Sequence, residues 1–293
     1  MANKLNILVP IGFSDQSIMA LDQALVFAQA APDAHLTLLT VIEEDGFFKR
    51  VFGAKKNTEE LRQKVDSRIK ELADEYRAKC NFKIETIVAK GLVYEEIARV
   101  VEMMECNLVV MGTNGKPQNL RRRFIGSNAY RTASLVQPPV VAVKGIRKPQ
   151  KVETIIFPLV LDRRSKEKVG PAIHYAKLFN AQIKIVSVLQ VEDQAKIVRA
   201  HLHQVDKFIS DKGIACTTEL IENPQHKGVV RNTLEYAYEN DGDLLIITED
   251  DRERDITDYF LGTDVQAVMY HSEIPVMSIT PSEVKWQALW EAF

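Results

Sequence analysis

The strongest constraint on the fold is that the chain repeats itself. Short apolar runs recur in the same order in both halves, as residues 7–10 (ILVP) and 155–158 (IIFP) show. Glycine markers recur with them, since Gly126-Ser127 in the first half corresponds to Gly262-Thr263 in the second. A fixed order of matching segments indicates one structural unit written twice. With 293 residues, the chain is long enough for two such domains.

Each copy alternates short apolar runs with segments of helical spacing. In the first copy, Ser14 is suited to cap the first helix. The pattern predicts strands over residues 6–9, 36–42, 82–89, 108–111 and 140–143, and helices over 17–31, 59–79, 93–104 and 126–135. Such alternation implies a mostly parallel sheet with helices on both faces. The expected fold class is therefore α/β, with one sheet in each copy.

The repeat also predicts the domain boundaries. Residues 145–151 (GIRKPQK) are typical of a linker, which gives domains over residues 1–147 and 151–281. Residues 282–293 place Trp286, Leu289, Trp290 and Phe293 on one face of a short helix. We expect this C-terminal amphipathic helix to dock on the chain itself or on a second subunit, because an exposed apolar face is adhesive.

Charge and cysteine content exclude several classes of function. The net charge of −2 provides no overall field for nucleic acid or an anionic membrane. No apolar run approaches the roughly 20 residues of a membrane-spanning helix. The three cysteines are scattered and form no CxxC pair, which favours a reducing compartment. We therefore expect a cytoplasmic protein with no nucleic-acid partner and no membrane span.

A glycine-marked segment follows the fourth strand of the first copy. Gly112-Thr-Asn-Gly115 comes directly after the strand, and Gly126-Ser127 opens the next helix. Glycines let backbone N–H groups approach an anion, and a helix N-terminus presents free donors. Because parallel sheets bind ligands at the carboxyl ends of their strands, this segment is a candidate phosphate cradle. A purely structural turn is the alternative, since turns use glycine in any case.

The arrangement Gly112-x-x-Gly115, a spacer and then Gly126-Ser127 resembles the ATP-binding signature of the universal stress protein family. The flanking residues 107–113 (NLVVMGT) and the opening residues 7–10 agree with it, and the similarity spans about residues 4–281. The resemblance implies a five-stranded parallel sheet of the flavodoxin-like, adenine nucleotide hydrolase-like type in each copy. It also implies a role in the stress response, and binding of ATP or another adenine nucleotide in the first copy, with Mg²⁺ only alongside ATP.

The resemblance implies a nucleotide site at the ends of strands one, two and four and at the start of the following helix. The candidate residues are Pro10, Ile11, Gly12, Phe13, Ser14, Val41, Met111, Gly112, Asn114, Gly115, Arg123, Gly126, Ser127 and Asn128. The family commonly associates through its fifth strand, so residues 140–143 and 276–279 are expected to pair within the chain. Whether two chains then form a homodimer is left open.

The sequence departs from the family pattern in ways that bear on ligand binding. Gly12 stands where the family often has an aspartate that meets the nucleotide, and the spacer has ten residues instead of nine. In the second copy the glycine positions are Thr248 and Asp251, and the aspartate position is Val160. Acidic residues at this loop repel phosphate, so we expect no ATP in the second copy.

The sequence therefore leaves three functional classes open. The intact glycine pattern favours a nucleotide-binding sensor or regulator, whereas Gly12 favours a structural or interaction protein without nucleotide. No catalytic base or metal ligand set is visible, so we expect no enzyme, with slow ATPase activity left open. His201 and His203 are two residues apart and do not share a helix face, which argues against a metal site.

Two further segments have open interpretations. Residues 121–123 are three arginines within the spacer, which either help to hold phosphates or form a solvated face. Phe47, Phe48 and Phe52 lie among basic residues in an insertion of the first copy. This insertion is interpreted as a packed loop, with a lid over the site or a contact for a partner or membrane surface as alternatives.

Overall fold

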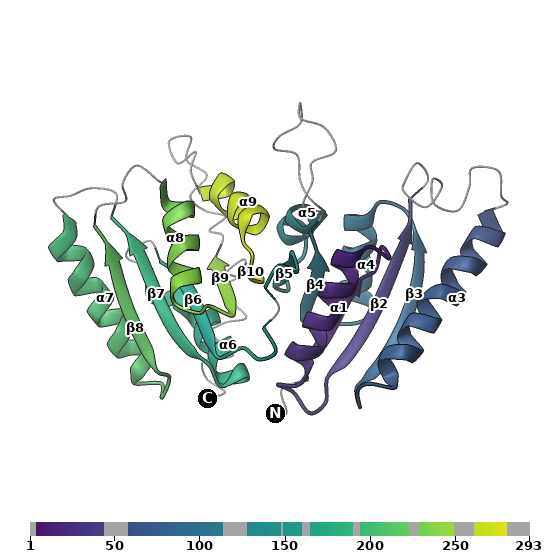
Figure 1. The fold of residues 1–293 in the computed structure, drawn as a ribbon, viewed down its shortest axis with the longest axis horizontal. Coiled ribbons are helices and arrows are strands. Elements are labelled where there is room, and N and C mark those ends of the chain that lie inside the picture. Colours follow the sequence, from purple (N-terminus) through teal and green to yellow (C-terminus); the bar gives the residue numbers. More distant parts are fainter. Residues whose placement is uncertain are drawn as a thin grey trace. The chain divides into compact units, whose positions relative to one another are not determined.

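The computed structural model describes residues 4–43, 58–113, 128–147, 149–159, 165–189, 194–222, 228–248 and 261–279. The chain divides into two compact units, Met1–Gly145 and Ile146–Phe293 (Figure 1). The predicted insertion around residues 46–58 lies almost wholly outside the described residues, and so do the arginines 121–123 and the predicted C-terminal helix. Each unit is an α/β layer structure, as the alternating pattern predicts.

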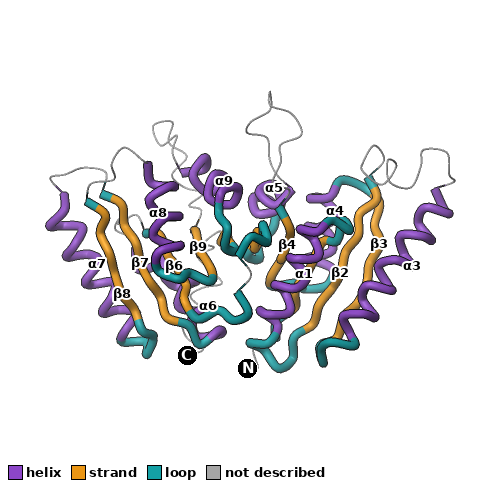
Figure 2. Tube along the Cα trace, viewed as in Figure 1, coloured by secondary structure: helices purple, strands orange, loops and turns teal. Residues whose placement is uncertain are grey.

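The first unit contains five parallel strands in the order β3-β2-β1-β4-β5. Its elements are β1 (Asn6–Pro10), α1 (Asp15–Ala28), β2 (His35–Ile42), α3 (Thr58–Arg77), β3 (Lys83–Lys90), α4 (Val93–Met103), β4 (Leu108–Gly112), α5 (Asn128–Leu135) and β5 (Val140–Val143). The predicted strands and helices are confirmed to within a few residues, and Figure 2 shows their alternation along the chain.

The second unit repeats this topology with the order β10-β9-β6-β7-β8. Its elements are β6 (Thr154–Pro158), α6 (Ser165–Phe179), β7 (Gln182–Val188), α7 (Ala195–Ser210), β8 (Cys216–Ile221), α8 (Gly228–Glu239), β9 (Leu244–Thr248), α9 (Leu261–His271) and β10 (Val276–Ile279). Each central strand pairs in parallel with two neighbours, as β6 does with β7 and β9. The α/β fold with a five-stranded parallel sheet is therefore present in both units.

The core of the first unit is the pair of central strands β1 and β4. Ile7, Leu8 and Val9 of β1 have no exposed surface, and neither have Val109 and Val110 of β4. Strands buried on both faces lose the alternation of polar and apolar residues, which explains their continuous apolar sequence. The helices cover both faces of the sheet (Figure 1), and Tyr76 of α3 donates a hydrogen bond of 2.6 Å to Asp22 of α1.

A side chain just before β4 forms hydrogen bonds to the backbone at the amino end of β1. Asn107 accepts a hydrogen bond of 2.9 Å from the backbone N–H of Asn6 and donates one of 2.7 Å to the carbonyl of Lys4. In the second unit, Asp243 accepts bonds of 2.8 and 2.9 Å from the N–H groups of Glu153 and Thr154. In both units, backbone N–H groups at the start of the first strand thus donate to a side chain that precedes the fourth strand.

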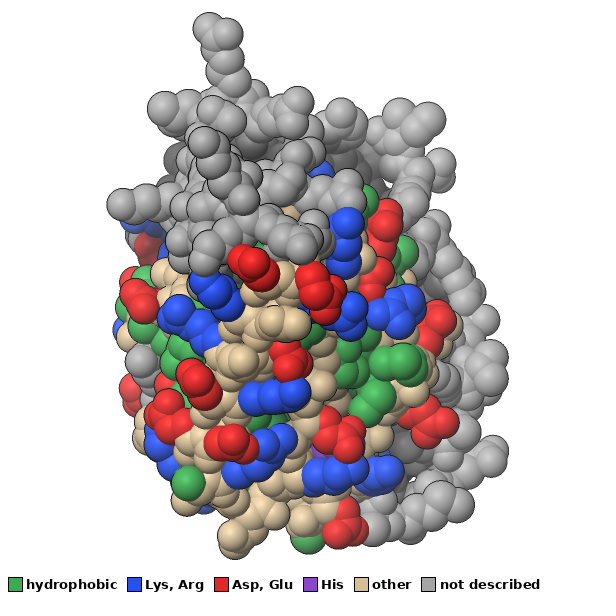
Figure 3. Space-filling model, turned by 90° about the vertical axis from the view of Figure 1, so that its right-hand side faces the viewer, with side chains coloured by type: hydrophobic (Ala, Val, Ile, Leu, Met, Phe, Trp, Pro, Cys, Tyr) green, Lys and Arg blue, Asp and Glu red, His purple; other side chains and the backbone are tan. Residues whose placement is uncertain are grey.

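Within the described residues, no helix has both the length and the apolar character needed to cross a membrane. On the face shown in Figure 3, basic and acidic side chains are interspersed, and the described part forms no broad patch of one sign.

The Asp243 contacts predict a local loss of stability in the second unit. Replacing Asp243 with Ala leaves the N–H groups of Glu153 and Thr154 without their acceptor, and we expect a loss of about 1–3 kcal/mol. The matched control is Glu239→Ala, which removes the same charge from an exposed position of α8. Urea unfolding of both variants measures the difference, and equal unfolding midpoints contradict the assigned role.

Burial of His174 in α6 predicts a pH dependence. Burial lowers the pKa of His174 below its ordinary value of 6.5. The unfolded chain therefore binds a proton more readily, so stability falls as the pH drops below about 7, by at most about 1.4 kcal/mol per pH unit. The His174→Gln variant is expected to unfold with a shallower pH dependence between pH 7 and 5. A His174→Gln variant whose unfolding keeps the wild-type pH slope would contradict this assignment.

Candidate functional site

The order of the strands places the candidate site of the first unit. From β1, the chain moves outward to β2 and β3 and then returns to the other side of β1 for β4 and β5. The direction reverses between β1 and β4, and their carboxyl ends are Pro10 and Gly112. Loops that leave two neighbouring strands in opposite directions leave a crevice between them, where α/β sheets bind ligands.

The loop after β1 is held close to β2. Ile11 donates its backbone N–H to the carbonyl of Leu39 at 2.7 Å and accepts the hydroxyl of Thr40 at 3.0 Å. Phe13 then adopts a positive φ of 55°, which is uncommon for a bulky residue and turns the chain into α1. Phe13 packs against the buried pair Ile42 and Val65, so its ring belongs partly to the core.

Ser14 caps α1, as the sequence predicts. Its hydroxyl accepts the N–H of Ser17 at 3.3 Å, and the Ser17 hydroxyl donates to the carbonyl of Ser14 at 2.8 Å. The next residue, Asp15, lies in the first turn, where a carboxylate is stabilised by the helix dipole. The hydroxyl of Ser14 is therefore already engaged with the helix, and a ligand would have to share it.

Gly112 is required by the packing of α1 on β4. A Cβ atom at this position would lie 2.5 Å from the carbonyl oxygen of Gln16 and 2.9 Å from the nitrogen of Ser17. Because these are backbone atoms, no side-chain movement can relieve the contact. The first turn of α1 and the end of β4 thus meet at the switch point, and only glycine permits this separation.

Gly12 has the opposite surroundings. Apart from its two chain neighbours, no atom of the described residues lies within 4 Å of a Cβ placed on it, and its φ is not positive. The described fold therefore does not demand glycine here, because a Cβ atom fits at this position. The open space beside Gly12 lies in the loop that leads from β1 to α1.

The structure describes nine of the fourteen candidate residues, and the assignment of all fourteen to a nucleotide site stays a prediction. Val41 on β2 and Met111 on β4 are buried, with exposed fractions of 6% and 4%, so each offers little surface to a ligand. Asn128 is exposed at the start of α5. The remaining candidates lie outside the described residues: Asn114, Gly115, Arg123, Gly126 and Ser127. Their placement in the site stays a prediction.

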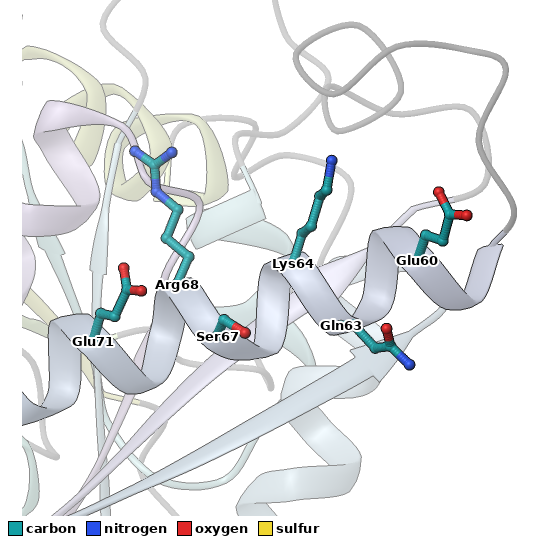
Figure 4. A pocket seen from close by; sticks show the side chains of 6 residues that line it. All are labelled: Glu60, Gln63, Lys64, Ser67, Arg68 and Glu71. Atoms are coloured by element: carbon teal, nitrogen blue, oxygen red, sulfur yellow. The ribbon is translucent and has the colours of Figure 1, made fainter.

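Helix α3 contributes residues that sequence reasoning missed. Its polar face lines a shallow groove of about 670 Å³ (Figure 4), through Glu60, Gln63, Lys64, Ser67, Arg68 and Glu71. Arg68 places its guanidinium carbon 5.0 Å from the centre of the Phe13 ring, a cation–π contact. The spacing along α3 marks this polar face in the sequence, but only the folded chain brings Arg68 to the loop after β1.

The described residues contain little else that could support chemistry. They hold no group of three or more histidine, cysteine or acidic side chains that could bind a metal ion. Burial raises the pKa of the Cys106 thiol to about 11, and burial with a contribution from Asp206 raises that of Cys216 to about 12. Neither thiol is a thiolate at neutral pH, so neither is a ready nucleophile.

In the second unit, the corresponding strand ends differ. Leu159 follows β6 and donates its N–H to Val186 at 2.9 Å, as Ile11 does to Leu39 in the first unit. However, β9 ends on Thr248 where β4 ends on Gly112. The acidic residues that follow, 249–251, lie outside the described residues.

The two glycines of the first unit predict contrasting effects of the same change. Gly112→Ala is expected to lower the free energy of unfolding by about 1–3 kcal/mol, because the added methyl group meets the backbone of α1. Gly12→Ala should alter stability by no more than about 0.5 kcal/mol in the destabilising direction, since its surroundings are open. Thermal or urea unfolding separates the two variants. A larger loss in Gly12→Ala would contradict this geometry.

Comparison with known proteins agrees with this architecture. The universal stress protein family model matches residues 5–144. One universal stress protein of Methanocaldococcus jannaschii is 29% identical over 158 residues, covering 47% of this chain and 93% of its own. A second protein of that name from the same organism is 31% identical over 150 residues, covering 50% of this chain and 83% of its own.

A solved structure extends the likeness to almost the whole chain. The crystal structure of a universal stress protein from Archaeoglobus fulgidus superposes with a TM-score of 0.73 over 95% of this chain and 97% of that chain, at 16% identity. At this identity the match shows the fold alone. The family match over residues 5–144 and the relative that is 31% identical over 83% of its length show that the chain belongs to the universal stress protein family.

Proposed function

We propose that the first unit binds an adenine nucleotide, ATP in the first instance, at the switch point between β1 and β4. In this proposal the protein acts in the cytoplasm as a sensor or regulator in the stress response and not as an enzyme. The observation that supports it is the reversal of strand order between β1 and β4, whose carboxyl ends are Pro10 and Gly112, because sheets of this kind bind ligands at such a reversal. Mg²⁺ accompanies the ligand only when that ligand is ATP.

The chemistry of such a site is binding, supplied mainly by the backbone. The segment from β4 to α5 carries Gly115, Gly126 and Ser127, and α5 begins at Asn128. Free N–H groups at a helix start and in a glycine-rich segment suit phosphate oxygens. The nucleoside then extends toward β1 and β2, beside the residues 10–14 that follow β1.

The second unit has a different role in this proposal. Thr248 and Asp251 replace the two glycines, and Glu249 and Asp250 add negative charge to the same segment. Like charges disfavour a bound phosphate. The second unit therefore serves as a structural partner, and we propose that it associates with the first through β5 and β10, the edge strands of their own sheets.

A protein that works through its surfaces and binds no nucleotide is the second candidate. The observation that favours it is again Gly112, because packing against α1 requires glycine there with or without a ligand. The first glycine of the pattern is thus explained without any function. Gly12 favours the same alternative, since it provides no carboxylate beside the crevice.

Calorimetric titration of the full chain with ATP and Mg²⁺ separates the two candidates. Wild type is expected to bind, and Gly115→Asp to lose at least about tenfold in affinity, because a carboxylate would stand where phosphate oxygens lie. Asp251→Asn, a change at the matching position of the second unit, should leave the affinity unchanged. Thermal unfolding confirms that each variant is folded.

The stability of the protein in the presence of ATP also distinguishes the two candidates. Saturating ATP should raise the stability of a true binder by about 2.7 kcal/mol at a hundred times its dissociation constant. A wild-type protein that shows neither heat of binding nor stabilisation with ATP or AMP is not a nucleotide sensor.

A further inference from the structure

The chain that leaves β5 is bound to the second unit almost at once. Arg147 donates its backbone N–H to the carbonyl of Glu273 at 3.0 Å, and its guanidinium carbon lies 4.7 Å from the centre of the Tyr238 ring. The Nε atom of Arg147 also lies 3.5 Å from a carboxylate oxygen of Glu273. A segment with the composition of a flexible linker is therefore held at its start by a backbone bond, a cation–π contact and an ion pair.

Tyr238 takes part in both halves of this arrangement. It lies in the last turn of α8, where its ring carries Arg147 and its hydroxyl accepts the backbone N–H of Glu273 at 2.9 Å. Glu273 belongs to the turn between α9 and β10, in which the buried Ser272 donates its hydroxyl to the carbonyl of Ile274 at 2.8 Å. Tyr238 thus fixes the turn to which Arg147 is bonded. We call the residues Arg147, Tyr238 and Glu273 the latch.

The segment is anchored a second time a few residues later. Val152 has an exposed fraction of 3%, and the N–H groups of Glu153 and Thr154 donate to Asp243. Asp243 closely follows α8, so both anchors lie at the carboxyl end of that helix. Residues 146–153, apart from 148, which lies outside the described residues, are therefore fixed to the second unit at both ends, and we call them the strap.

The chain is also fixed on the side of the first unit. Gly145 has a φ of 80°, and a Cβ atom added there would lie 1.9 Å from the sulfur of Met19 on α1. The backbone angle and the packing of Met19 therefore both require glycine at this position. Only Ile146 separates Gly145 from Arg147, so the connection between the units has almost no free length while the latch is closed.

The two anchors of the strap differ in burial. At the far end, Val152 is buried and Asp243 accepts two backbone hydrogen bonds. At the latch, the side chains of Arg147 and Glu273 are 43% and 40% exposed, and Ile146 is 56% exposed. Exposed ion pairs and cation–π contacts are weak, and segments with little buried surface open locally without global unfolding. The latch is thus the end of the strap that opens first.

We propose that the strap is a conformational device that sets how freely the two units move, and that Tyr238 is the residue that holds it closed. With the latch closed, the flexible part of the connection is limited to Ile146. When Arg147 leaves Tyr238, the flexible part extends as far as Val152, and each released residue adds up to about 3.5 Å of reach. The device does not depend on the proposed nucleotide site, since all of its residues belong to the second unit.

Hydrogen–deuterium exchange of the full chain, followed by mass spectrometry, measures the state of the latch. In wild type the backbone N–H groups of Arg147 and Glu273 are expected to exchange slowly, because both donate to protein acceptors. Tyr238→Leu removes the ring and the hydroxyl, and should speed the exchange of both groups by at least about tenfold. Peptides from β6 and β9 should keep their wild-type rates, since opening of the strap is local.

Two further variants separate the contacts of the latch. Tyr238→Phe keeps the ring under Arg147 and removes the acceptor for Glu273, so the Glu273 N–H should lose more protection than the Arg147 N–H. The matched control is Glu153→Gln, which weakens the exposed 2.9 Å ion pair with Lys151 in the same strap. This control should leave the exchange of both N–H groups unchanged.

Limited digestion with trypsin gives an independent measure. Cleavage after Lys144, Arg147 or Lys151 cuts the chain between its units, and Tyr238→Leu is expected to be cut there about tenfold faster than wild type. A wild-type strap that exchanges and is cut as fast as in Tyr238→Leu contradicts the proposal, and so does a Glu153→Gln variant that loosens the strap equally. If Tyr238→Leu also speeds exchange in β6 and β9, the opening is not local and the proposal is wrong.

Discussion

The reversal of strand order between β1 and β4 determines how the helices and the strand ends of the first unit are arranged. Two strands that are buried on both faces must pair in parallel at the centre of the sheet, and right-handed crossovers then send helices to both faces. At the amino ends, Asn6 and Asn107 close the sheet with side-chain hydrogen bonds to the backbone. The carboxyl ends of β1 and β4, Pro10 and Gly112, lie at the reversal of strand order where sheets of this kind bind ligands.

The second unit shows which features belong to the fold and which are free to change. Asp243 repeats the role of Asn107, and Glu105 and Asp241, two residues before them, share positive φ angles of 50° and 51°. The amino ends of the strands are thus built alike. The carboxyl ends differ, with Gly112 in one unit and Thr248 in the other. The two units are alike where the core needs it, and they differ at the carboxyl ends of their strands.

The glycines of the first unit show that a sequence motif does not by itself reveal whether packing or ligand binding requires its residues. Gly112 belongs to the glycine pattern that resembles a phosphate-binding signature, yet backbone contact with Gln16 and Ser17 already demands it. Gly12 breaks the family pattern, and no steric reason requires glycine there. Packing thus explains the glycine at position 112 and leaves the one at position 12 without a steric reason.

The sequence by itself determined the α/β class, the repeat, the strand and helix order and the Ser14 cap, because each depends on local periodicity or a single turn of helix. The family was likewise recognisable from residues contiguous in the chain. Only the tertiary structure decided that Gly112 meets α1 and that Arg68 reaches Phe13, since these contacts join segments that are distant in sequence. Periodicity reports which face of an element is buried, but the neighbour that buries it depends on strand order.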